Sequence, residues 1–316
     1  APPFPTTGGA LAAPLDVLST AVSAVCVTGL VVVDTPSHWS WFGEAVILLL
    51  IQVGGLGYML GTTVVLWALG RRLGLRDRHL LRLYYGAPSL HETMSFAKSL
   101  AVFALLFECA GAMLLFLLFW STGEPTGRSL WWGVFHSVSA FNNAGFSITG
   151  RDMIPYAGNP AVLAVLATLV VAGSVGFLPI VTLVHRGAFS RLPLDHKLIF
   201  ATSAALLAAG GLVFTAVEWT NPHTLGDLAP ADRPVVGLFY SASARTAGFN
   251  AVEFDETRDE TKITVVGLMF IGGAAGSTSG GVKVGAFALL FAMMLSTLRC
   301  EERATDFELF EPAIIV

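Results

Sequence analysis

Four stretches of this chain are apolar over about 20 residues or more, and charged side chains are rare within them. They cover residues 42–69, 95–120, 160–184 and 198–219. A helix needs roughly 20 apolar residues to cross a lipid bilayer. The chain as a whole is 54% hydrophobic and 13% charged, whereas soluble domains carry about 25% charge. The sequence therefore predicts an all-α polytopic membrane protein. Its small net charge of −4 argues against nucleic acid as a partner.

A fifth apolar stretch, residues 263–298, is too long for one straight span at about 1.5 Å per residue. Its middle holds a glycine-rich run from Gly272 to Gly281, which would break a helix. We expect two half-helices joined by a loop inside the membrane. Irregular backbone at that depth survives only where it is buried in protein or lines a water-filled path.

Three shorter apolar segments, residues 15–30, 130–146 and 234–249, do not fit as spans, and we expect them to enter the membrane and return. With this topology most basic residues lie in the inner loops, as the positive-inside rule requires. Those residues are Arg71, Arg72, Arg76, Arg78, Arg82, Lys98, Arg186, Arg191, Lys197, Arg299 and Arg303. Treating the short segments as full spans would reverse the later loops and remove this bias.

The three short segments end in similar sequences, which indicates an internal repeat. Residues 139–146 read SAFNNAGF, residues 241–249 read SASARTAGF, and residues 23–30 read SAVCVTGL. The glycines that correspond are Gly29, Gly145 and Gly248. Each copy follows a short apolar helix and precedes a spanning helix. The sequence therefore predicts a module of helix, loop and helix that is repeated around an axis.

This module suits the recognition of a dehydrated cation, which must exchange its water shell for oxygen ligands. Rings of backbone carbonyls can supply those ligands, and glycine adopts the required backbone angles at little cost. The C-terminal end of each short helix would direct its negative dipole toward the ion. Acidic residues between 253 and 260 follow the third segment, where they either attract cations or belong to a solvated loop.

Several motifs carry a resemblance to a known family. They are Val27–Leu30, Val33–Thr35, Gln52–Gly57, Ser139–Ser147, Arg245–Asn250 and Ile271–Val284. Together they resemble the Trk/Ktr/HKT superfamily of potassium transporters, and most closely the membrane subunit of bacterial Ktr systems. The resemblance covers nearly the whole chain. It implies a multi-pass protein of the inner (plasma) membrane that takes up potassium ions, with sodium as a candidate coupling ion and no organic cofactor.

The resemblance also assigns site residues and partners. It implies a selectivity filter that binds the transported ion through Val27, Thr28, Gly29, Asn143, Ala144, Gly145, Thr246, Ala247 and Gly248. It implies an intramembrane gating loop made of Gly276, Ser277, Thr278, Ser279, Gly280 and Gly281, with Lys283 beside it. The partners that it implies are a second copy, which forms a homodimer, and a cytosolic nucleotide-binding regulatory subunit.

Family members carry four modules with pseudo-fourfold symmetry. In this chain we expect a first module without its opening helix at residues 1–75, and a complete second module at residues 76–190. A third module with a broken last helix would occupy residues 191–300, and residues 301–316 would begin the connection to an absent fourth. We therefore expect the chain to be a fragment of a longer protein.

Four polar residues in apolar surroundings have both a functional and a structural interpretation. Lys283 is either an electrostatic gate contact or a side chain that extends to the membrane surface. We expect Arg245 to brace the third loop by bonding to carbonyls or to Glu253. Glu108 is either functional or bonded to a neighbouring helix, and we interpret His136 as a buried histidine with satisfied hydrogen bonds.

The sequence motifs of common enzymes are incomplete in this chain. Residues 276–283 resemble a phosphate-binding loop, but Val282 stands where that motif requires lysine. The pair His91 and Glu92 is followed by Ser95 where a zinc protease has its second histidine. We therefore expect no enzymatic activity. An intramembrane enzyme and a non-conducting assembly subunit are kept as alternative hypotheses.

Overall fold

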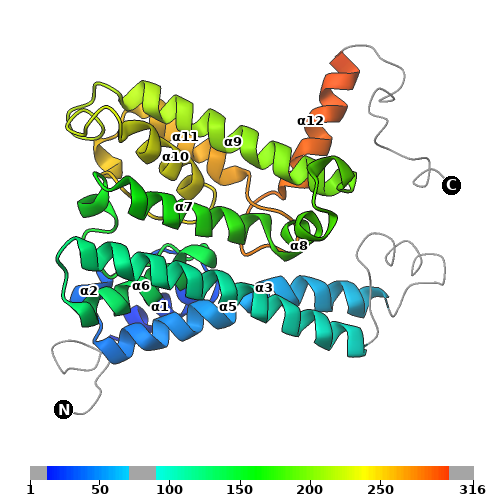
Figure 1. The fold of residues 1–316 in the computed structure, drawn as a ribbon, viewed down its shortest axis with the longest axis horizontal. Coiled ribbons are helices and arrows are strands. Elements are labelled where there is room, and N and C mark those ends of the chain that lie inside the picture. Colours follow the sequence, from blue (N-terminus) through cyan, green and yellow to red (C-terminus); the bar gives the residue numbers. More distant parts are fainter. Residues whose placement is uncertain (1–12, 71–89, 299–316) are drawn as a thin grey trace.

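The computed structural model describes residues 13–70 and 90–298. Within these residues the chain is almost wholly helical, and it forms no β-strand beyond two isolated bridges (Figure 1). The helices are α1 (Pro14–Val25), α2 (Thr35–His38), α3 (Trp41–Gly70), α5 (Leu90–Ser121), α6 (Thr126–Phe141), α7 (Pro160–Val175), α8 (Phe177–Arg186), α9 (Leu194–Glu218), α10 (Arg233–Ala244), α11 (Asp259–Phe270) and α12 (Val284–Leu298). Short 3-10 turns lie at Ile154–Tyr156, Phe189–Arg191 and Phe254–Glu256. The all-α fold class is confirmed, and the proposed connection at residues 301–316 lies outside the described residues.

Three of the described helices are long and apolar enough to cross a membrane. Their membrane-compatible parts are Trp41–Met59 in α3, Ala97–Ser121 in α5 and Leu194–Glu218 in α9. In each of them less than half of the apolar window is buried inside the protein, and side chains such as Leu106 and Leu212 point outward. Outward apolar side chains along a whole helix need lipid rather than water around them.

The prediction of one straight helix over residues 160–184 is wrong, although the two helices found there are together long and apolar enough to form one bent span. Helix α7 ends at Val175, and α8 continues at an angle of 95° to it. The bend is at Gly176, where φ is +81°, a backbone angle that side chains other than hydrogen rarely allow. The carbonyl of Ser174 at this bend accepts the N–H of Ala274, at 2.8 Å. A segment distant in sequence therefore fills the break.

The three short apolar segments form the short helices α1, α6 and α10, as predicted. Helix α6 packs along α5, and α10 packs along α9 (Figure 1). Gly133 and Gly237 make this packing close, because a side chain at either would meet the backbone of the neighbouring helix within 3 Å. Helices α6 and α10 are thus each held closely against a long helix.

The predicted break in the fifth apolar stretch is also confirmed. Helix α11 ends at Phe270 and α12 begins at Val284, and the residues between them are not helical. The two ends of this segment are paired, because Gly272 N–H donates to the Val282 carbonyl at 3.0 Å and Val282 N–H donates to the Phe270 carbonyl at 3.0 Å. The segment, residues 271–283, is therefore a closed loop with its ends together.

Helix α7 lies at the centre of the described helices, between α5 and α6 on one side and α9 and α10 on the other (Figure 1). Its side chains Val162, Leu163 and Leu166 are fully buried. Because α6 and α10 both pack against α7, their C-terminal ends lie close together. The loops that follow these two helices are brought side by side as a result.

Candidate ion-binding site

Each of the three repeated loops has the same backbone signature. Two residues per loop, separated by one residue, have positive φ, and the second of the two is glycine. The pairs are Val27 (54°) and Gly29 (75°), Asn143 (57°) and Gly145 (69°), and Thr246 (73°) and Gly248 (80°). In an extended strand successive carbonyls point to opposite sides. A positive φ at every second residue turns the peptide groups, so that successive carbonyls can point to the same side. A carbonyl-lined path for a cation needs such an arrangement.

The first residue of each pair is not glycine, and the β-branched Val27 and Thr246 are rare in this conformation. A left-handed residue with a side chain costs roughly 1–2 kcal/mol. The loops are held by backbone bonds to the preceding helix turn. Ala144 N–H donates to the Ser139 carbonyl at 2.8 Å, and Ala247 N–H donates to the Ser243 carbonyl at 2.9 Å. These bonds fix the strained angles in place.

Serine side chains close two of the loops in the same way. The hydroxyl of Ser139 donates to the Phe146 carbonyl at 2.8 Å in the second loop. The hydroxyl of Ser243 donates to the Phe249 carbonyl at 2.5 Å in the third loop. Both serines are buried. Each loop is therefore stapled to the last turn of its own helix, and its carbonyls have little freedom to rotate.

The three loops meet backbone to backbone. A side chain at Gly29 would lie 2.6 Å from the carbonyl oxygen of Ala144 in the second loop. A side chain at Gly145 would lie 2.6 Å from the carbonyl oxygen of Ala247 in the third loop. These positions need glycine for space as well as for their φ angle. The first loop thus contacts the second and the second contacts the third, and a carbonyl oxygen lies at each of these two contacts.

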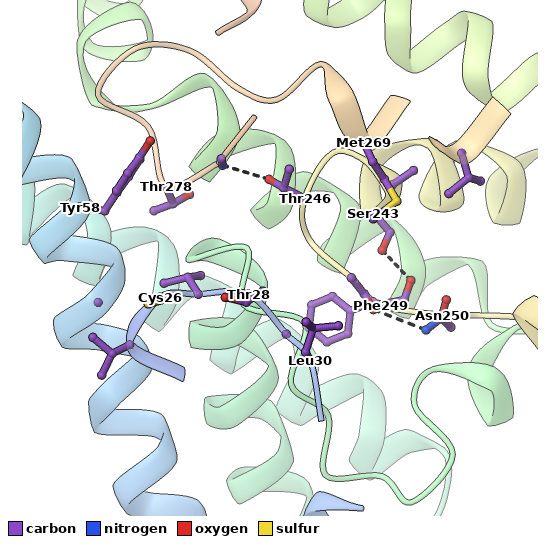
Figure 2. Close-up of a pocket in the computed structure, with 18 of the residues that line it drawn as sticks. Cys26, Thr28, Leu30, Tyr58, Ser243, Thr246, Phe249, Asn250, Met269 and Thr278 are labelled. Carbon is purple, nitrogen blue, oxygen red and sulfur yellow. Dashed lines mark hydrogen bonds between the residues drawn. The ribbon is translucent and has the colours of Figure 1, made fainter. Parts of the chain in front are cut away.

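A cavity of about 1080 Å³ lies between the first and third loops. Figure 2 shows Thr28 and Leu30 of the first loop opposite Thr246 and Phe249 of the third, with Tyr58 of α3 at one end. The polar groups among its lining residues are backbone groups, hydroxyls, the thiol of Cys26 and the amide of Asn250. The cavity is open enough for an ion with part of its water shell.

The segment 271–283 packs against one end of the second and third loops. Ser277, Thr278 and Ser279 at its tip are buried. The Thr278 hydroxyl donates to the carbonyl of Phe141, the last residue of α6, at 3.1 Å. The Ser279 hydroxyl donates to the carbonyl of Arg245, the residue that directly follows α10, at 3.1 Å. The segment is therefore bonded to the C-terminal ends of two short helices.

Side chains of the loops themselves also reach this segment. The amide of Asn143 donates to the Thr278 hydroxyl at 2.6 Å. The hydroxyls of Thr246 and Ser279 are 2.5 Å apart. Gly276 and Gly281, at the two sides of the tip, have φ of 73° and 71°. The structure thus brings most of the residues that the sequence analysis singled out into one connected cluster.

Lys283 joins this cluster to α3. Its ammonium group donates to the Ser279 carbonyl at 2.7 Å and to the Tyr58 hydroxyl at 3.0 Å. The same group lies 5.0 Å from the centre of the Tyr58 ring, within the range of a cation–π contact. Of the two interpretations, the structure favours a specific contact beside the cavity over a side chain that extends to the membrane surface. Tyr58 was not singled out in the sequence.

The other three polar residues are buried and bonded. Arg245 donates to the carbonyls of Ser203 and Gly272, at 3.4 and 3.1 Å. It does not pair with Glu253, which forms an ion pair with Arg151 at 2.9 Å.

His136 contacts the Trp132 carbonyl at 2.7 Å and the Ser147 hydroxyl at 3.1 Å, as expected of a satisfied buried histidine. Glu108 bonds to side chains of two neighbouring helices, Gln52 and Asn142. Both lie in motifs quoted from the sequence, but neither was expected to be a partner of Glu108. The only signal for Asn142 was that the second copy of the repeat carries two adjacent amides.

The described residues contain no group of three or more His, Cys, Asp or Glu side chains that could hold a metal ion. The oxygen atoms of the three loops themselves are neutral carbonyls and hydroxyls. Transition metals favour imidazole, thiolate and carboxylate ligands, whereas potassium sites in channels are built from backbone carbonyls. The chemistry of the site therefore suits an alkali cation.

Comparison with known proteins agrees with this chemistry. Residues 5–308 match the TrkH family, which is described as cation transport protein. The chain is 34% identical over 298 residues to Ktr system potassium uptake protein B of Bacillus subtilis, and 35% identical over 300 residues to the protein of that name from Vibrio alginolyticus. Each match covers 93% of this chain but only 66% and 65% of the relatives. The chain thus spans slightly less than two thirds of their length.

Two further similarities extend the comparison. The chain is 29% identical to potassium/sodium uptake protein NtpJ of Enterococcus hirae, over 96% of this chain and 67% of that protein. Its fold is similar to the crystal structure of the potassium transporter TrkH from Vibrio parahaemolyticus, with a TM-score of 0.69 over 92% of this chain and 56% of that chain, at 20% identity. These proteins are named for ion transport and not for an enzymatic reaction. The chain is a multi-pass protein of the plasma membrane and belongs to the TrkH family of cation transport proteins.

Proposed function

We propose that the complete protein takes up potassium ions across the plasma membrane, through a path lined by the three repeated loops. The observation that carries this proposal is the shared backbone signature of the loops together with their close contact at Gly29 and Gly145. Strained backbone of this kind is kept where function needs it. The relatives are named for potassium uptake, which supports potassium as the cargo, and the Enterococcus relative is named for potassium/sodium uptake, which supports sodium as a candidate coupling ion.

In this proposal the selectivity filter consists of Val27 to Gly29, Asn143 to Gly145 and Thr246 to Gly248. The three modules at residues 1–75, 76–190 and 191–300 each contribute one loop. The cavity between the first and third loops is the place where a further loop would complete the ring. Four loops around one axis would surround a cation with carbonyl oxygens, and three leave one side open.

The segment with Gly276 to Gly281 serves as a gate in the same proposal. Its position beside the second and third loops supports this role, because its tip is bonded to the C-terminal ends of α6 and α10 and Lys283 reaches Tyr58. The left-handed glycines beside the tip give it hinge positions. Lys283 holds the closed form through its contact with Tyr58. Opening requires that contact to break.

We also propose partners for the complete protein. The relatives from Bacillus subtilis and Vibrio alginolyticus carry the words "Ktr system" in their names, which supports assembly with another subunit. We propose a homodimer in the membrane and a cytosolic nucleotide-binding subunit on the inner face. The basic residues near the inner ends of the spans, such as Arg186, Arg191 and Lys197, could contact such a subunit.

Rubidium uptake into proteoliposomes tests the proposal. The complete gene product should take up rubidium, excess potassium should block it, and Gly248→Ser should weaken it at least tenfold. Gly267→Ser is the matched control, because Gly267 lies in α11 with ordinary helical geometry and its added side chain would meet nothing within 4 Å. This control should keep the uptake of the unchanged protein.

The result that contradicts the proposal is a folded complete protein that takes up no rubidium, with or without cytosolic extract as a source of the second subunit. That result would favour the alternative of a non-conducting assembly subunit. Equal effects of Gly248→Ser and Gly267→Ser would reject the assignment of the third loop while leaving transport itself intact.

A further inference from the structure

A carboxyl group is buried directly behind the second loop. Glu108 of α5 is 4% exposed, and it is surrounded by apolar helices. One of its carboxyl oxygens accepts the side-chain amide of Asn142 at 3.0 Å. The other accepts the side-chain amide of Gln52, from α3, at 3.1 Å. An acidic residue inside a membrane protein is expensive and is kept where it has a task.

Asn142 is the residue through which this carboxyl group can act on the loop. It caps the C-terminal end of helix α6, directly after Phe141, and immediately precedes the loop residues. Its amide nitrogen also contacts the Val138 carbonyl at 2.9 Å and the Gln52 side-chain oxygen at 3.3 Å. A side chain at Gly55 would overlap the amide oxygen of Asn142. Three helices therefore fix the orientation of one amide group.

The third loop is supported differently at the equivalent position. There Arg245 caps the C-terminal end of α10, and it donates to the Ser203 and Gly272 carbonyls. A cation thus stands behind the third loop and a carboxyl group behind the second. The backbone signature is the same in both loops, so the fold of the loop itself does not require an acid. Of these two loops, the second has the buried carboxyl group of Glu108 behind it and the third does not.

We propose that Glu108 is a positioning residue for the second loop. Through Asn142 it fixes the peptide groups of Asn143 and Gly145 and so sets how well the loop distinguishes potassium from sodium. The inference rests on the function proposed above. Both carboxyl oxygens of Glu108 accept from amide donors, so a glutamine in its place would turn a donor toward Gln52 or Asn142 and release the Asn142 amide. The difference between the two ions at a carbonyl site depends on how far the carbonyls can yield.

The geometry provides a sharp test, because Gln52 lies within reach of the same amide. In Glu108→Gln the carboxyl group is lost while the size of the side chain is kept. In the exchange variant, Glu108→Gln with Gln52→Glu, a carboxyl group contacts Asn142 from α3 instead of α5. Glu44→Gln is the matched control, since Glu44 is also a buried glutamate in a span but bonds to Trp131 of α6 rather than to the residue that precedes a loop.

The readout is the ratio of the sodium and potassium concentrations that halve rubidium uptake by the complete protein in proteoliposomes. We expect Glu108→Gln to lower this ratio about tenfold, which corresponds to about 1.4 kcal/mol. The exchange variant should recover the ratio of the unchanged protein to within about threefold, or about 0.7 kcal/mol. Glu44→Gln should leave it unchanged. Thermal stability in detergent is measured on every variant.

A merely structural role would lower the thermal stability of Glu108→Gln without moving the ratio, and that result overturns the proposal. An exchange variant as unselective as Glu108→Gln overturns it too. If Glu108→Gln does not accumulate in the membrane, the exchange variant decides: a normal ratio supports the proposal, and a tenfold lower one rejects it. An unchanged protein without rubidium uptake rejects the proposed function itself, which is a separate outcome.

Discussion

The carboxyl group of Asp152 accepts the backbone N–H of Asn250 at 2.6 Å, and it thereby joins the chain after the second loop to the chain after the third. A second bond, from Met153 N–H to the Asn250 carbonyl at 3.0 Å, runs in the opposite direction. Asp152 has φ of 50°, and its other carboxyl oxygen is buried with no hydrogen-bond partner among the described residues. These bonds therefore join the second and third loops at a second place, after the contact at Gly145.

This bond predicts a pH dependence of stability. Burial raises the pKa of Asp152 from 3.8 to about 7, although the Asn250 N–H partly opposes the shift. A raised pKa means that the folded protein prefers the protonated form, so this contribution to stability is complete below about pH 4 and is lost as the pH rises through about 7. The melting temperature in detergent should fall between pH 5 and pH 8 by about 2–4 °C more in the unchanged protein than in Asp152→Asn.

Asp152→Asn is suited to this comparison because its amide oxygen still accepts the Asn250 N–H. Identical pH profiles for the two proteins would contradict the prediction. Glu253→Gln is a useful companion, since Glu253 lies nearby in an exposed ion pair with Arg151. It should leave the profile as it is in the unchanged protein.

The contact between the second and third loops predicts a strong effect of Gly145→Ala. The added methyl group would lie 2.6 Å from the Ala247 carbonyl oxygen, and φ is 69° there. The backbone angle alone costs roughly 1–2 kcal/mol, and the clash displaces a carbonyl of the proposed filter. Rubidium uptake should fall more than tenfold, whereas Gly267→Ala should leave uptake unchanged. Normal uptake by Gly145→Ala would show that this junction does not line the ion path.

The contact between Lys283 and Tyr58 predicts faster uptake when it is weakened. Tyr58→Phe removes the hydroxyl that accepts from Lys283 and keeps the ring. A hydrogen bond to a charged group contributes about 1.5–3 kcal/mol, so the open form should gain at least a fewfold in population. Initial rates of rubidium uptake should rise accordingly. Lys283→Met also loses the bond to the Ser279 carbonyl and should raise the rate further. Slower uptake in both variants would argue against a closing contact.

A substitution at Glu218 should lower the stability of the protein without a specific loss of transport. It ends α9, and its two carboxyl oxygens accept bonds from four donors. These are the N–H of Arg258, the side-chain amide of Asn221 and the hydroxyls of Thr224 and Thr261. Arg258 is the residue that precedes the first turn of α11, so the carboxylate caps that helix from a distance.

In Glu218→Gln an NH₂ group replaces one carboxyl oxygen, so a hydrogen-bond donor faces the donors that were bonded to that oxygen. It should lower the stability by about 2–3 kcal/mol, because buried groups lose their partners. The melting temperature in detergent reports this change. Glu253→Gln is the control, since exposed ion pairs contribute only about 0–1 kcal/mol. An equal melting temperature for the two variants would mean that the four bonds at Glu218 contribute little.

Much of the helical architecture follows from the sequence, because lipid requires long apolar runs and glycine interrupts them. The break between α11 and α12 was predicted on this ground from the run Gly272–Gly281. The sequence does not predict the bend at Gly176, because the segments before and after it are both apolar and hydropathy does not show where the chain changes direction. The reason for the bend lies elsewhere in the chain: Ser277 packs against Gly176, about a hundred residues earlier.

The site could be predicted in part. The repeat pointed to Gly29, Gly145 and Gly248, and all three have the positive φ that makes glycine necessary. Their assignment to a selectivity filter stays a proposal. The partners of Glu108 were not predictable, because Gln52 and Asn142 are 56 and 34 residues away in the sequence. Arg245 illustrates the same limit, since its partners come from α9 and from the broken helix.

The hydroxyls of Thr278 and Ser279 are bonded to carbonyls that end α6 and α10. Movement of this segment must release those carbonyls, which stand next to the loops. Two sites that share hydrogen bonds are thermodynamically linked, and linkage is reciprocal. If opening the segment weakens cation binding by some factor, then a bound cation favours the closed segment by the same factor. The ion concentration itself would then act as a regulator of how often the protein opens.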